Sequence, residues 1–443
     1  MQEVLDYLYN LERFGIKLGL DVIKELLHKL DNPQNKFKSV HIAGTNGKGS
    51  TACFLDSILK CSGKKVGLYT SPHLIKFNER IQINGQDISD EDLVLLTTKI
   101  KEVCEQNKIQ ATFFEFTTVI AFLYFAENNV DYSVIETGLG GRLDATNVIT
   151  PEISVITNID IDHTKHLGET KEKIAMEKAG IIKQNSLVLT AEQDPSILEI
   201  FSNVCKEKKS KLCVLDDKFE IKLINSDLHG QEFFLTGKME GNFSIKMLGQ
   251  HQIRNATLAI MGARKLGISQ EDIHEGLSKA YWPARLDIIK QNPLVMVDCA
   301  HNLAGIKQLV GFLKNLGGDA RARDPLKISS QNFCPSIGAD TTKINKKKTL
   351  LLGTSEDKQI SEMLKLLIPL FDQVILTQGN YKPASLELLE KEVRKYCSKV
   401  YSYSDLKEAI SKAIELTNED EMLVITGSIY LVGDVLGHRN LFK

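Results

Sequence analysis

The chain has 443 residues, which is too long for one compact core and predicts at least two domains. With 42% hydrophobic and 25% charged residues, its composition is that of an ordinary globular protein. A formal net charge of −2 argues against a nucleic-acid or membrane-surface binder, because such proteins usually carry a basic excess, so we expect small-molecule partners. The acidic N-terminus and the lack of an apolar run of roughly 18 residues indicate a cytoplasmic protein.

Residues 1–30 carry apolar residues at helical spacing, which predicts two helices before the first strand. Val40 and Ile42 then suit a short buried strand, and helical spacing returns from Ala52 to Leu59. Between them lies the stretch HIAGTNGKGST. A glycine loop between a strand and a helix presents backbone N–H groups and the positive end of the helix dipole to an anion. We therefore predict a nucleotide phosphate loop; a glycine-rich turn without a ligand is the alternative.

Several residues of this loop are predicted to bind the nucleotide, namely Asn46, Gly47, Lys48, Gly49 and Ser50. Lys48 can reach the outer phosphates, and Ser50 or Thr51 can face a magnesium ion. The pattern departs from the common P-loop in two ways. The residue six positions before Lys48 is Ile42 rather than glycine, and Gly49 separates the lysine from the hydroxyl group.

The segment GTNGKGS resembles the nucleotide loop of the Mur ligase superfamily, in particular that of the folylpolyglutamate synthase and dihydrofolate synthase branch. Further motifs of that branch follow in order along nearly the whole chain. The resemblance implies an α/β fold: a P-loop-containing central domain of the Mur ligase type with an appended small antiparallel sheet, and a smaller C-terminal Rossmann-like α/β domain. We expect these domains at residues 1–286 and 287–443.

The segment from Thr70 to Ile81 is polar and interrupted by proline, and it is predicted to be a loop. The resemblance implies that Ser71 contributes to a magnesium site. It also implies that the aromatic part of this loop lies near the pteridine, which makes Phe77 and Arg80 candidate substrate residues. Thr117, in a predicted helix that ends near Glu127, is a further candidate substrate residue. An ordinary connecting loop is the alternative for residues 70–81.

A buried strand from Val130 to Ile135 is predicted to end in Glu136, and the glycine-rich loop TGLGGRLDATN follows it. Ligands of open α/β sheets bind at the carboxyl ends of the strands. Glu136 is therefore a candidate metal ligand, or else it caps a neighbouring helix. The resemblance adds Arg142 and Asp144 of the glycine-rich loop to the candidate substrate residues.

The next predicted strand, residues 153–157, leads into the motif NIDIDH. A lone histidine in such a place is usually structural. The match to the Asn-x-x-x-Asp-His pattern of the family implies instead that His163 binds a metal. In the motif EKAGI, Lys178 resembles the family lysine whose amine is carboxylated, which would offer a hard metal an anionic oxygen. A lysine that only complements its helix dipole is the alternative.

Short strands dominate from Leu187 to Gly249, and alternation in the later ones predicts the antiparallel sheet. The motif QHQIRNA then opens a helix. The family has an asparagine on the adenine side of the nucleotide in this motif, which makes Asn255 a candidate nucleotide residue. A surface helix residue is the alternative.

Strands and helices alternate beyond residue 287 and predict a second, smaller parallel sheet. Asp298, His301 and Asn302 lie at the end of one of its strands, near residue 297. In the family, the arginine and the aspartate that match Arg285 and Asp298 reach across the domain cleft to the nucleotide. Residues 319–347 lack a sustained period and are predicted to be a disordered insertion far from the chemistry.

These residues together predict an ATP-dependent amide ligase that activates a carboxylate as an acyl phosphate, a reaction that needs charge neutralisation and alignment. The resemblance implies two Mg²⁺ ions, and addition of L-glutamate to dihydropteroate, to the γ-carboxyl group of tetrahydrofolate, or to both. The candidate catalytic residues are Lys48, His163, Lys178, Asp298 and His301. A Mur-type cell-wall ligase and a P-loop NTPase switch acting on a protein are the alternatives. We expect a monomer without nucleic-acid or membrane partners.

Overall fold

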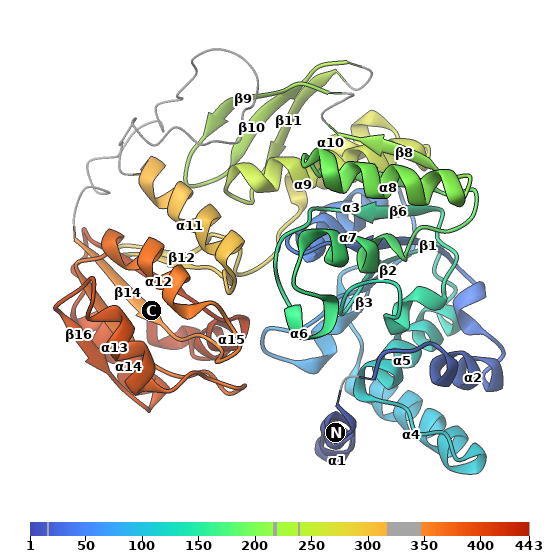
Figure 1. The fold of residues 1–443 in the computed structure, drawn as a ribbon, viewed down its shortest axis with the longest axis horizontal. Coiled ribbons are helices and arrows are strands. Elements are labelled where there is room, and N and C mark those ends of the chain that lie inside the picture. Colours follow the sequence, from blue (N-terminus) through green and yellow to red (C-terminus); the bar gives the residue numbers. More distant parts are fainter. Residues whose placement is uncertain (16, 216–218, 238–239, 317–346, 443) are drawn as a thin grey trace. The chain divides into compact units, whose positions relative to one another are not determined.

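The structure, a computed structural model, describes residues 1–15, 17–215, 219–237, 240–316 and 347–442 (Figure 1). The predicted insertion at residues 319–347 lies outside the described residues apart from Lys347. By internal contacts the chain forms two compact units, Met1–Phe219 with Arg254–Ala280 and Glu220–Ile253 with Tyr281–Lys443. The contacts thus group residues 220–253 with the second unit, and the domain boundary expected after residue 286 stays a prediction.

Within the described residues, the first unit contains an eight-stranded sheet in the order β4-β3-β2-β5-β1-β6-β7-β8. The pairings from β2 to β8 in this order are parallel, whereas β3 pairs antiparallel with both β2 and β4. Their bounds are β1 Lys38–Ala43, β2 Val66–Tyr69, β3 Ile81–Ile83, β4 Gln86–Asp87, β5 Tyr132–Glu136, β6 Ile153–Ile156, β7 Leu187–Thr190 and β8 Lys211–Val214. The predicted parallel α/β sheet is confirmed.

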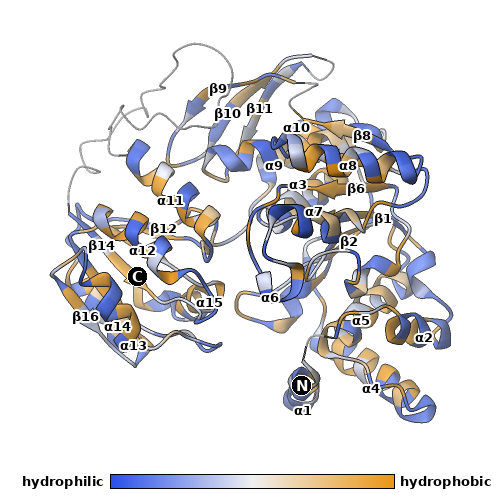
Figure 2. Cartoon of the chain, viewed as in Figure 1, coloured by the Kyte–Doolittle hydropathy of each residue, from blue (hydrophilic) through white to orange (hydrophobic). Residues whose placement is uncertain are grey.

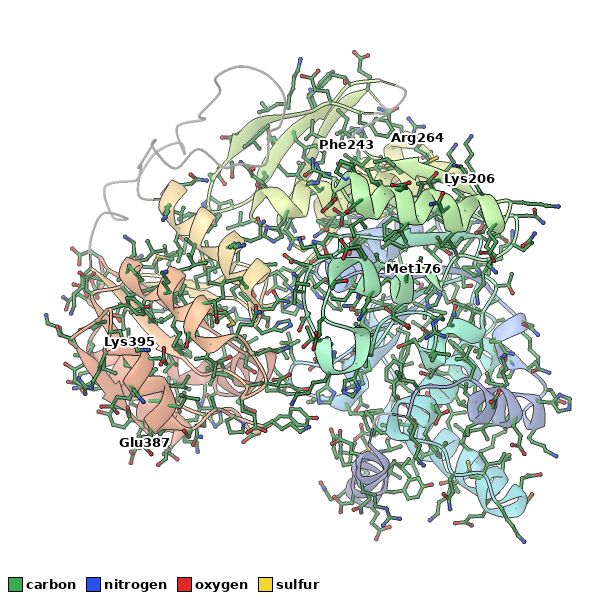
Figure 3. The ribbon with its side chains drawn as sticks, viewed as in Figure 1. Met176, Lys206, Phe243, Arg264, Glu387 and Lys395 are labelled. Atoms are coloured by element: carbon green, nitrogen blue, oxygen red, sulfur yellow. The ribbon has the colours of Figure 1, made fainter. Side chains whose placement is uncertain are left out.

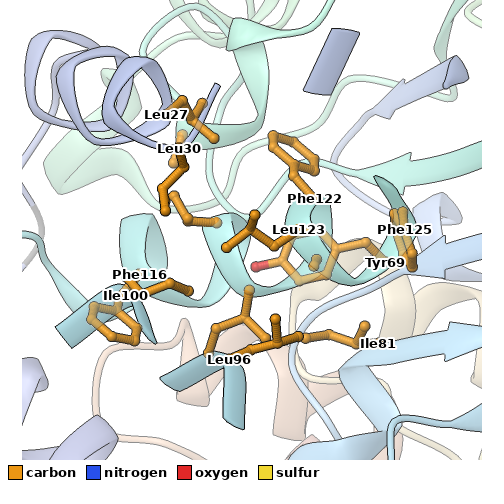
Figure 4. Packing of buried hydrophobic residues seen from close by; sticks show 14 of the residues in the cluster. Leu27, Leu30, Tyr69, Ile81, Leu96, Ile100, Phe116, Phe122, Leu123 and Phe125 are labelled. Carbon is orange, nitrogen blue, oxygen red and sulfur yellow. The ribbon is translucent and has the colours of Figure 1, made fainter. Parts of the chain in front are cut away.

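Helices pack around this sheet, and α5 lies at the centre of one hydrophobic core (Figure 4). It is apolar on all sides, and Phe116, Phe122 and Phe125 are buried against residues such as Tyr69 of β2. A helix of this kind is stable only when it is buried all round. The bounds of the helices are α1 Gln2–Asn10, α2 Asp21–Lys29, α3 Lys48–Cys61, α4 Asp90–Asn107, α5 Phe113–Glu127, α6 Thr164–Leu167, α7 Lys171–Ala179, α8 Pro195–Glu207, α9 Gln250–Lys265 and α10 Gln270–Lys279.

The prediction of an unbroken loop from Thr70 to Ile81 is wrong at its end. Phe77–Arg80 forms a 3-10 turn, and Ile81 begins β3, which pairs with β2. The strand is too short to show a period in the sequence, and pairing with β2 stabilises it. Helix α10 was also not predicted. Gly276 lets it approach α3 closely, because a Cβ there would lie 2.4 Å from the Cα of Ile58.

The second unit contains the antiparallel sheet β11-β10-β9 and a six-stranded sheet in the order β12-β13-β17-β14-β15-β16, counted within the described residues. In the larger sheet only the pairing of β12 with β13 is antiparallel. The antiparallel sheet and the Rossmann-like sheet are therefore confirmed, but the contacts group the antiparallel sheet with the second unit and not with the central domain to which it was expected to be appended. The strands are β9 Ile221–Ser226, β10 Gln231–Leu235, β11 Gly241–Ile245, β12 Asp287–Gln291, β13 Leu294–Val297, β14 Lys348–Leu352, β15 Gln373–Leu376, β16 Val400–Ser402 and β17 Met422–Thr426.

The helices of this unit are amphipathic, with hydrophobic and hydrophilic residues mixed along α12, α13 and α14 (Figure 2). Helices α12 and α13 bury their apolar faces in a core with strands such as β14 and β15, whose residues are largely buried. None of the helices in the described ranges is long and apolar enough to cross a membrane. The helices are α11 Leu303–Leu316, α12 Ile360–Leu367, α13 Leu386–Val393, α14 Leu406–Glu415 and α15 Ile429–Gly437.

Candidate functional site

The phosphate loop between β1 and α3 is held by the segment that follows β6. The backbone N–H of Thr45 donates to the carbonyl of Asn158 at 2.9 Å, and the N–H of Asn46 donates to the side-chain oxygen of Asn158 at 2.9 Å. The Thr157 hydroxyl donates to the carbonyl of Asn46 at 2.6 Å. The first N–H groups of any α-helix lack intrahelical partners, so the start of α3 supplies donors for an anion.

Two glycines allow this arrangement. Gly47 has φ 82°, and a Cβ there would lie 2.5 Å from the side-chain oxygen of Asn255. At Gly44, a Cβ would lie 1.8 Å from the Thr157 hydroxyl oxygen. The predicted nucleotide residue Asn255 is buried, and the structure brings it against the phosphate loop.

Lys48, Glu136 and Ser71 come together from three segments of the first unit. The Lys48 amine lies 3.8 Å from one Glu136 oxygen, and the other oxygen accepts the backbone N–H of Ser71 at 3.2 Å. The Lys48 side chain is 19% exposed and that of Glu136 is 6% exposed. A cation beside the helix start suits phosphate, and a carboxylate next to it suits a hard metal that the phosphate also binds.

Magnesium in proteins is usually held by one or two carboxylates together with substrate phosphates. Glu136 beside the phosphate loop fits that role. Among the described residues, no group of three or more His, Cys, Asp or Glu side chains is arranged to hold a metal ion, so a purely protein-built site is not indicated there. His163 is exposed at the N-terminal end of α6, on the segment that continues from Asn158. The metal roles of Ser71, Glu136 and His163 stay predictions.

Lys178 is buried on α7, although lysines near helix ends are usually solvated. Its amine donates to the carbonyl of Gly44, in the phosphate loop, at 2.8 Å. Burial, and next the positive charge of Lys48, lower the pKa of Lys178 from 10.5 to about 7. Two residues earlier on the same helix, Met176 is 53% exposed (Figure 3). The helix thus directs Lys178 inward, where a neutral amine is populated near neutral pH.

The glycine-rich loop after β5 is organised by Asp144. One carboxylate oxygen accepts the N–H of Leu139 at 2.7 Å, and the other accepts the N–H of Thr146 at 3.0 Å and its hydroxyl. The Thr146 hydroxyl is also 2.8 Å from Nε2 of His41, a buried histidine of β1. Burial raises the pKa of Asp144 and lowers that of His41 to about 3. These bonds show Asp144 as an anchor of the loop, and its contact with substrate stays a prediction.

The other candidate substrate residues of the first unit occupy different settings. Arg142 is exposed and pairs with Glu177 at 2.8 Å. Thr117 is fully buried, with its hydroxyl 3.1 Å from the Tyr69 hydroxyl, so it belongs to the core around α5. Their substrate roles stay predictions.

Phe77 and Arg80 form a compact cluster with Phe113 and His73. The Arg80 guanidinium carbon lies 5.8 Å and 5.3 Å from the ring centroids of Phe77 and Phe113, and its Nε donates to Nδ1 of His73 at 2.8 Å. Burial, and then the charge of Arg80, lower the pKa of His73 to about 3. The neutral imidazole therefore accepts the arginine bond at any pH near neutrality. The substrate roles of Phe77 and Arg80 stay predictions.

In the second unit, Arg285, Asp298 and His301 gather at the carboxyl end of β13. The Asp298 oxygens accept the N–H groups of Leu286 at 2.8 Å and Ala300 at 2.9 Å. Burial raises the pKa of Asp298, and these bonds and the charge of Arg285 oppose the shift. Nδ1 of His301 lies 2.8 Å from the carbonyl of Cys299. The strand end thus carries one buried acid beside one arginine and one histidine.

Several residues that shape the site were not predicted, above all Thr157, Asn158, Thr146 and His41. Asn158 stands in the NIDIDH motif and could have been found there. The others are ordinary strand or loop residues, and only their contacts distinguish them.

Comparisons with known proteins show the family to which the chain belongs. The Mur ligase middle domain matches residues 42–263, and the dihydrofolate synthetase C-terminal domain matches residues 336–438. Dihydrofolate synthase/folylpolyglutamate synthase of Bacillus subtilis is 35% identical, over 98% of both chains. The crystal structure of folylpolyglutamate synthase from Thermotoga maritima has a TM-score of 0.83 at 34% identity, covering 100% of this chain and 97% of that one.

Crystal structures of Mycobacterium tuberculosis folylpolyglutamate synthase complexed with ADP and AMPPCP have a TM-score of 0.83 at 28% identity, over 98% of each chain. The coverage extends over both units of the fold, so the similarity is not limited to the phosphate loop. The chain belongs to the folylpolyglutamate synthase and dihydrofolate synthase family of ATP-dependent ligases.

Proposed function

We propose that the protein adds L-glutamate to dihydropteroate, to the γ-carboxyl group of tetrahydrofolate, or to both, at the expense of ATP. The observation that carries this proposal is the convergence of Lys48, Glu136 and Lys178 on one glycine loop at a helix start. The names of the relatives and the nucleotides bound by the M. tuberculosis enzyme support it.

In the proposed reaction the γ-phosphoryl group of ATP passes to the folate carboxylate and gives an acyl phosphate and ADP. The glutamate amine then attacks the acyl carbon, an amide bond forms, and phosphate leaves. Lys48 and the N–H groups at the start of α3 would hold the phosphates in line and offset their charge. Magnesium, when bound with ATP, supplies further neutralisation, and Glu136 would hold it with Ser71 and His163. In the second unit, Arg285, Asp298 and His301 would contact the nucleotide or the reacting groups.

We also propose that Lys178 is carboxylated. Its neutral amine would attack CO₂, form an N–C bond and release one proton, and the resulting carbamate carries a negative charge. The buried amine with a pKa near 7 supports this step, since only the neutral form is nucleophilic. The carbamate nitrogen keeps one hydrogen, so it can still donate to the Gly44 carbonyl.

The decisive experiment is an assay of ADP release by the purified protein with dihydropteroate and tetrahydrofolate in parallel, each with and without L-glutamate. We expect release that depends on glutamate and on at least one folate substrate. ATP hydrolysis that needs neither would indicate an NTPase switch. Activity only with a cell-wall precursor and its amino acid would indicate the Mur-type alternative.

We propose that the partners are small molecules, which agrees with the net charge of −2. We propose a monomer located in the cytoplasm, and size-exclusion chromatography with light scattering tests the monomer. A stable dimer would contradict it.

A further inference from the structure

Glu192 is a buried residue in the turn that follows β7, and its carboxylate has no role in the reaction proposed above. One oxygen accepts the backbone N–H of Ile159 at 2.7 Å. The other accepts the N–H groups of Gln193 and Asp194, each at 2.9 Å. Hydrogen bonds to a charged acceptor are stronger than neutral ones, so this carboxylate fixes the position of Ile159 relative to β7.

Ile159 stands between the two residues that grip the phosphate loop. On one side, Asn158 accepts the N–H of Asn46. On the other, the N–H of Asp160 donates to the Thr45 hydroxyl at 2.9 Å, and that hydroxyl lies 3.1 Å from the Asp160 carbonyl. A shift of Ile159 would therefore move both contacts with the loop at once.

The same turn is tied to the helix that carries the predicted adenine-side residue. Arg254 of α9 donates from Nη2 to the carbonyl of Ala191 at 2.8 Å. The next residue, Asn255, lies against Gly47. The turn at Ala191 and Glu192 thus connects to the phosphate loop by two routes, through Ile159 and through α9.

We infer that Glu192 is a positioning residue for the nucleotide, which holds the segment 158–160 so that the phosphate loop keeps its binding shape. This inference rests on the proposed function for the identity of the ligand as an adenine nucleotide. A positioning role can be told apart from a merely structural one. Because one of the loop contacts is made by Asn158, substitutions at Glu192 and Asn158 should have coupled effects on nucleotide affinity.

The test is ADP binding by the full-length protein, measured by calorimetry together with the urea unfolding midpoint. In Glu192→Gln only one oxygen remains as an acceptor, and the new amide group faces an N–H donor. We expect about tenfold weaker ADP binding, the usual worth of a hydrogen bond to a charged group. Glu199→Gln, on the exposed surface of α8, is the matched control and should bind ADP like the unaltered protein.

A double-mutant cycle separates positioning from general destabilisation. Asn158→Ala removes the acceptor for Asn46 and should weaken ADP binding, whereas Asn158→Asp keeps an acceptor and should weaken it less. In the Asn158→Ala background, Glu192→Gln should weaken ADP binding by a smaller factor than in the unaltered protein, because only the Asp160 contact with Thr45 and the route through α9 remain to be disturbed. Should Glu192→Gln not fold, Glu192→Asp replaces it in the cycle, because the shorter side chain cannot reach Ile159 and the turn together.

Normal ADP affinity in the folded Glu192 variants, or fully additive losses in the cycle, would overturn the inference. If the unaltered protein did not bind ADP, both the proposed function and this inference would fall. If it bound ADP but the Glu192 variants did so equally well, the proposed function would stand and only the positioning role would be lost.

Discussion

The carboxyl ends of β1 and β13 carry candidate ligand groups in the two sheets, but their loops are held differently. After β1, the glycine turn is held by Thr157 and Asn158, more than a hundred residues away in the chain. After β13, the turn is held by its own Asp298, which bonds Ala300 two residues on and Leu286 twelve residues back.

At the first strand end the residues of the turn are left for binding, whereas at the second strand end the acidic residue also holds the local backbone. Because remote groups hold the first turn, its own side chain Lys48 and the helix N–H groups remain to face an anion. In the second turn the acid itself holds the backbone, and Arg285 and His301 lie at the same strand end. We therefore expect substitutions at the first strand end to act mainly on nucleotide affinity and rate. Those at the second should act on stability as well.

The largest effect is expected for Lys48→Ala. Loss of a preorganised charge contact with a phosphoryl group commonly lowers the rate by about a hundredfold to a thousandfold. The side chain is partly exposed and its ion pair with Glu136 is long at 3.8 Å, so the unfolding midpoint should change little. Steady-state ADP release and urea denaturation measure the two quantities. Lys36→Ala, at an exposed lysine, is the control. Near-normal activity of Lys48→Ala would remove the phosphate-loop assignment.

Lys178→Ala should lower activity by about a hundredfold, in the upper range for residues that support a metal site. Acetate added to this variant should restore part of the rate by placing an oxygen anion in the vacated space. Lys206→Ala, at an exposed lysine of α8 labelled in Figure 3, serves as the control and should keep full activity. A fully active Lys178→Ala protein, or a bare amine in crystallographic density beside an occupied metal site, would end the carbamate proposal.

Gly47→Ala and Gly63→Ala form a matched pair, since both glycines have positive φ, 82° and 76°. Each alanine should cost roughly 1 kcal/mol of unfolding free energy from backbone strain. Only at position 47 does the new Cβ meet the Asn255 side chain, whereas at position 63 no atom lies within 4 Å. ADP affinity should therefore fall about tenfold in Gly47→Ala alone. Equal affinities in the two variants would show that the Asn255 contact does not matter for the nucleotide.

Asp298→Asn probes the second strand end. The amide keeps one acceptor, so one of the N–H groups of Leu286 and Ala300 loses its partner. A buried unsatisfied group typically costs roughly 1–3 kcal/mol of stability. Asp357→Asn, at an exposed aspartate, should be neutral. An unchanged urea unfolding midpoint of Asp298→Asn would contradict the role of Asp298 in holding its own turn. The ratio of stability loss to rate loss in Asp298→Asn can be compared directly with the same ratio in Lys48→Ala.

The last prediction concerns the pH dependence of stability. The pKa of Lys178 is about 7 in the folded protein and 10.5 as its ordinary value. Between these two pH values the unfolded chain binds more protons at this site than the folded protein does. The contribution of unmodified Lys178 to stability therefore rises as the pH increases from about 7 to 10.5, and it is lost as the pH falls through the same range. Urea unfolding in CO₂-free buffer measures it against Lys178→Met, which lacks the titrating amine. A difference that is constant over this range would contradict the shifted pKa.

The order of elements followed from the sequence because it depends on local patterns. A short strand was predicted at Val40 and Ile42, which lie within β1, and the glycine loop was placed between that strand and a helix by its residues and their immediate neighbours. Glu136 was placed at the end of β5 for the same reason. Hydrophobic periodicity and glycine turns act over a few residues, so they can be recognised without the fold.

Tertiary structure alone decided which groups hold the site. Asn158, which follows β6, accepts a hydrogen bond from Asn46, which follows the adjacent strand β1. Thr146 is hydrogen-bonded to His41 of β1, and the Lys178 amine donates to the Gly44 carbonyl. These contacts join residues up to about a hundred and thirty positions apart, and each depends on strand order and helix rotation rather than on residue type. Burial also sets the charge states, because desolvation lowers the pKa of Lys178 only once the fold has removed its amine from water.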